Sequence, residues 1–432
     1  MSTSQVAALT APEPAPYDDG RRRAQARRIT GALLVSQSLG SAGTVAAATV
    51  ASIVGAELSG LASLSGLPSA VNQVGIAFGS LLWSRLSDVW GRRTALTGGL
   101  LTGALGAVTA MVGVAIGSFV LVLVGLTVSG SGNASVQLGR FVAAEVTPRA
   151  HRAKAIATVV LGGTVGSVLG PALVAPTGRF MASLGFSEIA GPYIATAVGF
   201  FLTAGLLFTF LRPEPRTIGA ELGAYERGDA EESAPRSLRQ MLADVNVRVA
   251  VTCLVTAHMV MVGLMQMTSL HMHDHDHSLG SISLVFSSHT MGMFAFSVLS
   301  GWLTDRWGRK PVALGGAMLL LLSCALAPLS PDVLPIAFAL FLLGLGWNLC
   351  YVAGSALLSD ALTTAEKGTM QGFNDLVMGG AAASAVMLGG LVLGGAGYTT
   401  LALLGGIACL PLTFLVVRMP GARVGLRRAA GD

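Results

Sequence analysis

Apolar runs of about 20 residues, the length that a helix needs to cross the apolar core of a lipid bilayer, recur along almost the whole chain. Of its 432 residues, 52% are hydrophobic and only 11% are charged. Such a composition excludes a water-soluble domain. We therefore predict an all-α integral membrane protein that is not an enzyme and whose partner is the lipid bilayer rather than nucleic acid.

The apolar runs can be placed as twelve membrane-spanning helices. We expect these helices at residues 30–54, 63–87, 95–116, 118–144, 153–176, 190–211, 247–270, 280–303, 311–329, 332–361, 367–394 and 397–418. A polar stretch divides them six and six, which predicts bundles at 30–211 and 247–418 joined by a linker at 212–246. An even number of spans puts both tails, residues 1–29 and 419–432, on the same side of the membrane.

Basic residues indicate which side that is. Of the 27 Lys and Arg residues, only Arg179 falls on the side reached by the odd-to-even connections. An excess of basic residues is typical of the cytoplasmic loops of membrane proteins. Both tails and the linker are therefore predicted to be cytoplasmic, and the net charge of +5 reflects topology.

Two loop segments occur at corresponding places in the two halves. The stretch SRLSDVWGRRTALTGG (84–99) shares Asp, Trp, Gly and Arg at identical spacing with GWLTDRWGRKPVALGG (301–316), and a second segment, 131–155, matches 346–370. The repeats resemble the loop signature of the major facilitator superfamily, which implies two pseudo-symmetric six-helix bundles that rock around a central site. The charged residues of these loops are candidates for gating: Asp88, Arg92, Arg93, Asp305 and Arg309.

Methionine and histidine are concentrated in one part of the second half. Residues 258–293 hold seven of the 16 Met and six of the 7 His residues. A spacing of four residues places Met261 with Met265 on one face of the seventh span, and His289 with Met293 on one face of the eighth. A rise of about 1.5 Å per residue puts all four near mid-membrane, at depths of roughly 15 to 24 Å. Because soft thioethers and imidazole select monovalent copper over harder ions, these four residues are the predicted metal ligands.

Other soft side chains lie near this predicted site. His258 is on the same helical face about one turn deeper and fits either a ligand or a core residue. Three further methionines point away and are assigned to packing: Met259, Met267 and Met291. Cys253 and Cys350 are candidates for a copper relay toward the cytoplasm, because a thiolate binds monovalent copper more strongly than a thioether. Both cysteines fit equally well as small buried hydrophobic residues.

The M-x-x-x-M motif on one span, followed by H-x-x-x-M on the next, resembles a narrower group, the CcoA-like copper importers of bacterial cytoplasmic membranes. This resemblance implies uptake of Cu(I) for the assembly of copper-containing respiratory oxidase, with a cytoplasmic copper acceptor as partner. Copper is then the transported ligand, no cofactor is expected, and the protein is expected to be a monomer. The alternative is a proton-coupled exporter of drugs or other small organic molecules, because Gly166, Gly170 and Pro171 resemble part of an antiporter motif.

The stretch HMHDHDHS at 271–278 lies in the predicted outer connection between the seventh and eighth spans. Its imidazoles alternate with Asp274 and Asp276, which suggests a flexible loop that collects metal ions. A polar loop that is simply solvated fits the same pattern. The candidate collecting residues are His271, His273, His275 and His277.

Asp375 is the one acid predicted to lie inside a span and away from its ends. Acids in such places are functional candidates. We favour an ion pair between Asp375 and Arg140 across the two halves, while proton coupling and balancing of the copper charge stay open.

Overall fold

The computed structural model describes residues 19–148, 151–226 and 236–418, so the expected C-terminal tail and most of the N-terminal tail lie outside these ranges. The long helices of the first half are α2 (Asp19–Ser59), α3 (Leu67–Trp90), α4 (Arg92–Ala115), α5 (Phe119–Glu145), α6 (Arg152–Ser183) and α7 (Gly191–Phe210). Those of the second half are α10 (Val245–His273), α11 (Leu279–Phe294), α12 (Ser297–Trp307), α13 (Arg309–Leu326), α14 (Val333–Asp360) and α15 (Thr364–Arg418). The short elements are η1 (Ala62–Leu64), η3 (Glu188–Ala190), α8 (Pro215–Glu226) and α9 (Leu238–Ala243).

Across the described ranges these helices form twelve spans, as the apolar runs predict. Ten segments are long and apolar enough to cross a membrane by composition alone. One of them, α15, supplies two spans because Gly397 interrupts its helical geometry, and α3 is the remaining span. The span expected at 280–303 is present as the apolar segment Leu279–Trp307, within which Ala295 and Phe296 separate α11 from α12.

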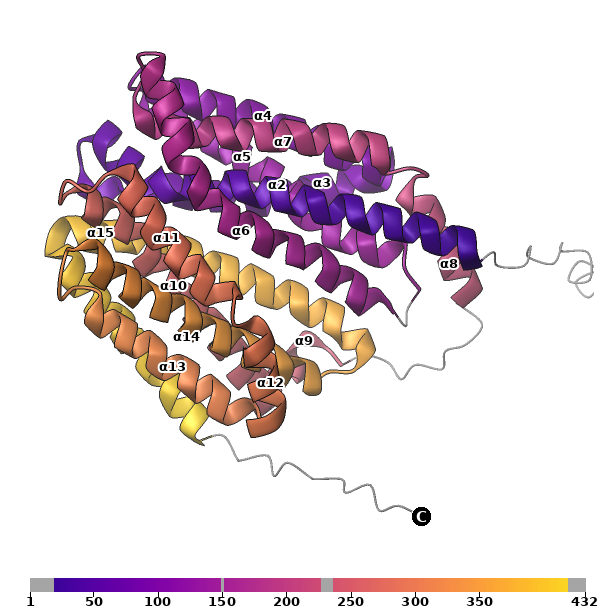
Figure 1. The fold of residues 1–432 in the computed structure, drawn as a ribbon. Helices are drawn as coiled ribbons and strands as arrows, with labels where there is room; N and C mark the ends of the chain where they lie inside the picture. Colours follow the sequence, from indigo (N-terminus) through magenta and orange to yellow (C-terminus); the bar gives the residue numbers. More distant parts are fainter. Residues whose placement is uncertain (1–18, 149–150, 227–235, 419–432) are drawn as a thin grey trace, which may run out of the picture.

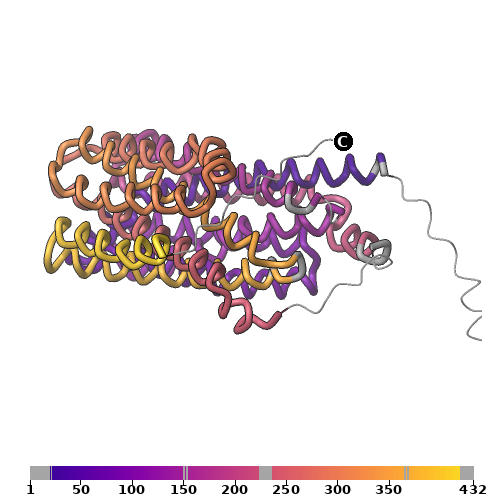
Figure 2. The backbone as a smooth tube through the Cα atoms, turned by 90° about the horizontal axis from the view of Figure 1, so that it is seen from below, coloured from indigo at the N-terminus to yellow at the C-terminus, as the bar shows by residue number. Residues whose placement is uncertain are grey.

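The two halves pack together at one end and separate toward the other (Figures 1 and 2). At the end where α2 finishes, a single cluster of buried apolar residues joins helices of both halves. At the opposite end, each half has a separate core. Polar contacts also close the shared end, where Ser52 Oγ of α2 lies 2.7 Å from Ser269 Oγ and donates to the Gln266 carbonyl oxygen at 2.8 Å.

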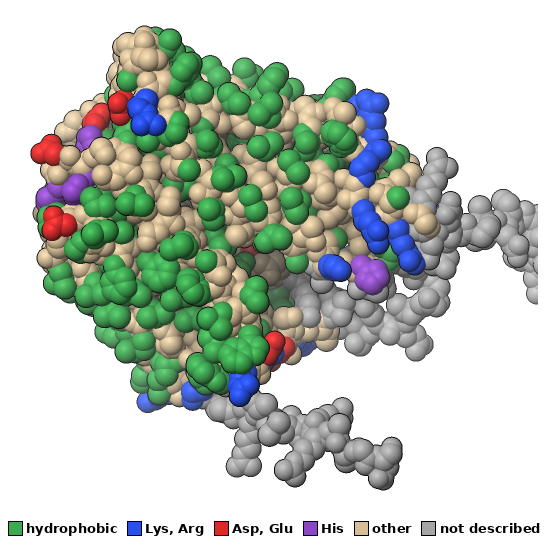
Figure 3. All heavy atoms as spheres, in the orientation of Figure 1, with side chains coloured by type: hydrophobic (Ala, Val, Ile, Leu, Met, Phe, Trp, Pro, Cys, Tyr) green, Lys and Arg blue, Asp and Glu red, His purple; other side chains and the backbone are tan. Residues whose placement is uncertain are grey.

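Charge distinguishes the two ends of the molecule. In Figure 3, most Lys and Arg side chains gather at the end where α2 begins, whereas acidic and His side chains gather at the opposite end. The segregation matches the orientation that the basic residues predict. We therefore call the basic end the inner end. Because the two halves pack together at the opposite, outer end, this conformation is closed on the outer side.

The repeated loop motif has a conformational basis. Gly91 and Gly308 occupy equivalent places in the two copies, between α3 and α4 and between α12 and α13, and both have positive φ angles, 86° and 92°. Only glycine adopts this conformation without steric cost. The sharp turn between antiparallel helices therefore explains why the same glycine recurs in each half.

Helices α11 and α14 approach each other closely through glycines. A Cβ atom on Gly344 of α14 would lie 2.2 Å from the His289 carbonyl oxygen, and one on Gly292 of α11 would lie 2.3 Å from the Phe341 carbonyl oxygen. Small residues permit such backbone contact between helices in lipid. This contact sets the position of His289, one of the predicted copper ligands.

We predict that Gly344→Ala lowers the stability of the protein by about 1–3 kcal/mol, because the added methyl group forces α11 and α14 apart. The matched control is Gly315→Ala, since nothing lies within 4 Å of a Cβ at that position. The control should leave stability unchanged or raise it by about 0.5–1 kcal/mol. Thermal unfolding of the detergent-solubilised protein measures both effects, and equal midpoints for the two variants would contradict the close approach.

Candidate functional site

His289 is held in one orientation by α14. Its side chain is fully buried, and its Nδ1 atom lies 2.9 Å from the Leu340 carbonyl oxygen. A carbonyl oxygen can only accept, so Nδ1 carries the proton and Nε2 presents a lone pair. Nε2 is buried and has no hydrogen-bond partner among the described residues. A ring fixed by one nitrogen with the other free is the arrangement that metal-binding histidines adopt.

The three predicted thioether ligands lie in the same apolar region. Met261 is 3% exposed, and the partly buried Met265 and Met293 pack against the core cluster that contains it. No group of three or more His, Cys, Asp or Glu side chains that could hold a metal occurs in the described ranges. A metal ion at His289 would therefore depend on thioethers for most of its ligands.

The two spans that carry the predicted ligands share a neighbour. Helix α14 packs against both α10 and α11, whereas α10 and α11 meet over only a short stretch. The Nδ1 edge of the His289 ring faces α14. Helical periodicity along α10 and α11 does not reveal that α14 lies against both of them, because that contact arises from packing between helices.

Two of the three methionines assigned to packing, Met267 and Met291, have surroundings different from those of the proposed ligands. Met267 is fully buried, and its Sδ atom accepts from Ser65 Oγ at 3.5 Å. Met291 is 50% exposed on the surface of α11, and Met259 packs against the core cluster. These three residues therefore serve as chemically matched controls for the proposed ligands.

The outer histidine stretch is not the flexible loop that its composition suggests. Helix α10 continues through His273, so histidines two residues apart point to different sides of the helix. Each ring has a neighbour of its own in this conformation. His271 stacks on Tyr398 with 4.2 Å between ring centroids, His273 Nε2 lies 2.8 Å from Glu57 Oε1, His275 Nδ1 lies 2.7 Å from the His271 carbonyl oxygen, and His277 Nε2 lies 2.8 Å from the Pro331 carbonyl oxygen. Metal collection by these residues stays a prediction for another conformation.

The ion pair between Arg140 and Asp375 is present, as the sequence predicts. Arg140 Nη2 of α5 donates to Asp375 Oδ2 of α15 at 2.6 Å, and Gln371 Nε2 donates to Asp375 Oδ1 at 2.9 Å. The side chains of the pair are 27% and 33% exposed. The pair joins the two halves away from the outer contact region, so its strength affects how readily the halves separate.

The arginines of the two loop motifs make equivalent ion pairs. Arg92 Nε donates to Glu145 Oε2 at 2.8 Å, and Arg309 Nε donates to Asp360 Oδ2 at 3.0 Å. Contacts with the expected acids are longer, 3.2 Å from Arg92 to Asp88 and 3.7 Å from Arg309 to Asp305. Arg93 Nε donates to the Phe208 carbonyl oxygen at 2.8 Å. Sequence reasoning missed Glu145 and Asp360, although the repeat of 131–155 at 346–370 aligns them.

The linker is attached to both halves. Glu214 accepts from the backbone N–H groups of Arg92 and Arg93 at the start of α4. At the other end of the linker, Arg236 Nε donates to Glu366 Oε1 at 2.7 Å, and the side-chain hydrogen bond from Arg236 holds the pKa of Glu366 well below its usual range. The anchoring was not predicted, because single charged residues in a polar segment carry no signal of their partners.

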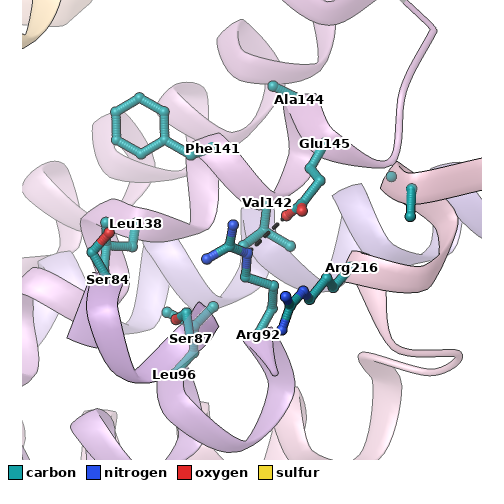
Figure 4. Close-up of a pocket in the computed structure, with 12 residues that line it drawn as sticks. Ser84, Ser87, Arg92, Leu96, Leu138, Phe141, Val142, Ala144, Glu145 and Arg216 are labelled. Atoms are coloured by element: carbon teal, nitrogen blue, oxygen red, sulfur yellow. Dashed lines mark hydrogen bonds and ion pairs between the residues drawn. The ribbon is translucent and has the colours of Figure 1, made fainter. Parts of the chain in front are cut away.

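A cavity of about 680 Å³ opens at the inner end of the first half (Figure 4). Its charged groups are already paired, Arg92 with Glu145, as the figure shows, and Arg216 with the Asp88 carbonyl oxygen. None of the predicted copper ligands lines it. Its wall comes from α3, α4, α5 and α8 and includes Ser84, Ser87, Leu96, Leu138, Phe141 and Arg216.

The two candidate relay cysteines are neighbours. Cys253 Sγ of α10 donates to the Cys350 carbonyl oxygen of α14 at 3.5 Å, and Cys350 Sγ donates to the Ala313 carbonyl oxygen at 3.6 Å. Both side chains are buried, 1% and 0% exposed. Their position between the thioether region and the inner end agrees with a relay and equally with core packing.

We predict that Arg140→Gln and Asp375→Asn each weaken the contact between the inner ends of the two halves. A partly exposed pair contributes about 1 kcal/mol or less after solvent screening, so each substitution should change the ratio of conformations by at most about fivefold. The double variant should change it no further, because the interaction is already lost. Distances between spin labels on the inner ends of α5 and α15 measure the ratio. Additive effects of the two substitutions would show that the pair does not couple the halves.

Comparison with known proteins identifies the family. The profile described as the Major Facilitator Superfamily matches residues 32–280 and 253–430. The chain is 33% identical to the uncharacterised MFS-type transporter YdeG of Bacillus subtilis over 89% of this chain and 90% of that one. It is 30% identical to the riboflavin transporter RfnT of Brucella anthropi over 91% and 96% of the two chains. A solved bacterial homologue of the lysosomal transporter Spinster has the same fold, with a TM-score of 0.66, 15% identity and coverage of 90% and 96%. The chain therefore belongs to the major facilitator superfamily and is a multi-pass secondary transporter.

Proposed function

We propose that this transporter carries monovalent copper into the cytoplasm. The observation that carries the proposal is the geometry of His289, whose Nδ1 is fixed by a carbonyl oxygen while Nε2 is buried without a partner in the described structure. An unpaired imidazole nitrogen in an apolar region is unfavourable unless something occupies it. Monovalent copper suits this nitrogen and the thioethers of the predicted ligand set, which are soft and uncharged.

Three methionines complete the proposed ligand set. Met261, Met265 and Met293 belong to or pack against one apolar cluster, and their thioethers disfavour hard divalent ions. Thioethers need no deprotonation and bind less tightly than thiolates, so they allow release. We propose that Cys253 and Cys350 bind the copper ion next, on its way to the inner end.

Inward movement needs no proton partner. An inside-negative potential favours the entry of one positive charge by about 2.3 kcal/mol per 100 mV. We place the protein as a monomer in the cytoplasmic membrane of a bacterium, which the bacterial relatives and the basic inner end support. A cytoplasmic copper acceptor would then receive the ion for oxidase assembly.

An organic solute is the second candidate. The relative that is 30% identical over 91% of this chain is named as a riboflavin transporter. This similarity favours a planar organic molecule over the drug-like cargo of an exporter. Transport of radioactive copper and of riboflavin by the same proteoliposomes distinguishes the two candidates.

We predict that Met261→Leu, Met265→Leu, Met293→Leu and His289→Ala abolish copper uptake while protein levels in the membrane stay near normal. Loss of one ligand should weaken copper binding by a few kcal/mol, which corresponds to about 100-fold or more. Met→Leu nearly conserves volume and should destabilise the fold by less than about 1.5 kcal/mol. Uptake of radioactive copper by whole cells, normalised to protein level, measures the effect.

The control substitutions are Met259→Leu, Met267→Leu and Met291→Leu. These should retain most of the uptake, because helical periodicity places their side chains off the face that carries the proposed ligands. If the ligand and control groups lose uptake equally, or if the first group loses it only because the protein disappears, the copper site is wrong.

A further inference from the structure

Trp347 lies at the centre of a group of rings from three helices of the second half. Tyr351, one turn along α14, stacks on its indole with 4.7 Å between ring centroids and an interplanar angle of 23°. Phe294 of α11 and His258 of α10 approach at 6.2 Å each, with angles of 75° and 49°. The group therefore combines one stacked ring with two rings that meet the indole at steeper angles.

Two polar atoms of this group lack hydrogen-bond partners in the described part of the chain. They are Nε1 of Trp347, a residue that is 8% exposed, and Nδ1 of His258. Buried polar atoms in native proteins nearly always have partners, so such exceptions point to an occupant. The indole N–H is a donor only and cannot bind a metal ion. Its occupant must therefore offer an acceptor, which copper does not.

The ring group borders the space between the two halves. Tyr351 lies within electrostatic range of both Asp375 and Arg140, the pair that bridges the halves. Since Trp347 and Tyr351 are four residues apart on α14, they share the same face. The surface in Figure 3 is hollowed between the halves toward the inner end. Because α14 runs from Val333 to Asp360 at the inner end, Tyr351 lies nearer that end than Trp347.

We propose that Trp347, Tyr351 and His258 form a binding site for a neutral, planar heteroaromatic solute with a carbonyl or ring-nitrogen acceptor. The solute stacks against the rings, which favour offset or edge-to-face contacts, and accepts a hydrogen bond from Trp347 Nε1. His258 forms a second hydrogen bond. The site lies about one turn inward of Met261 and uses none of the four proposed copper ligands, so it can be tested separately from copper transport. It would serve the second candidate function, the transport of an organic solute.

Riboflavin and biopterin are suitable probes, because both are planar, fluorescent and rich in acceptors. Fluorescence of each probe, titrated with purified full-length protein in lipid nanodiscs, should be quenched in a saturable manner. Trp347→Phe keeps a ring and removes the donor, so affinity should fall about tenfold. The matched control, Trp302→Phe, changes an exposed tryptophan of α12 and should leave affinity unchanged.

Two outcomes would overturn the proposal. Either neither probe binds saturably to the wild-type protein, or Trp347→Phe and Trp302→Phe, each with a normal thermal unfolding transition, bind the probes equally well. Met261→Leu separates this site from the copper site. It should leave probe binding intact while abolishing copper uptake, so the two proposals can fail independently.

Discussion

Polar atoms buried in a bilayer find no water to pair with, and the arrangement of the second half follows from that constraint. The contact between His289 Nδ1 and the Leu340 carbonyl oxygen satisfies one ring nitrogen and fixes α11 against α14. The same contact leaves Nε2 buried without a partner among the described residues. Nine buried side-chain polar atoms of the described residues are unpaired, and those of His289, His258 and Trp347 are the three on aromatic rings of the second half. A solute that pairs with these atoms would remove the cost of burying them.

The two halves share a framework but differ in their chemistry. Each places an arginine of the loop motif against an acid at the end of a neighbouring helix, Arg92 with Glu145 and Arg309 with Asp360. These pairs lie at the inner end, where they support the helix turns. The second half adds soft and aromatic side chains near mid-membrane, which agrees with a cargo that binds mainly to that half while the first half moves around it.

The sequence was sufficient for the helical spans and the Arg140–Asp375 pair, since apolar length and an isolated intramembrane acid are local signals. The orientation inferred from the charge bias stays a prediction. Sequence reasoning failed for features that depend on packing between helices far apart in the sequence. Helical periodicity places His289 on a face of its helix but does not reveal that α14 occupies the space beside it. The alternation of His and Asp resembles a loop, yet α10 extends through His273 because contacts with Glu57 and Tyr398 hold its last turn.

X-ray absorption at the copper edge tests the account most directly, because it reports the atoms bound to the ion without requiring transport. Purified protein loaded with one equivalent of Cu(I) should show sulfur neighbours together with one imidazole nitrogen. The nitrogen signal should disappear in His289→Ala and persist in Met291→Leu. A spectrum without sulfur neighbours, or one that is unchanged in His289→Ala, would contradict the claim that this buried imidazole and its neighbouring thioethers bind the transported ion.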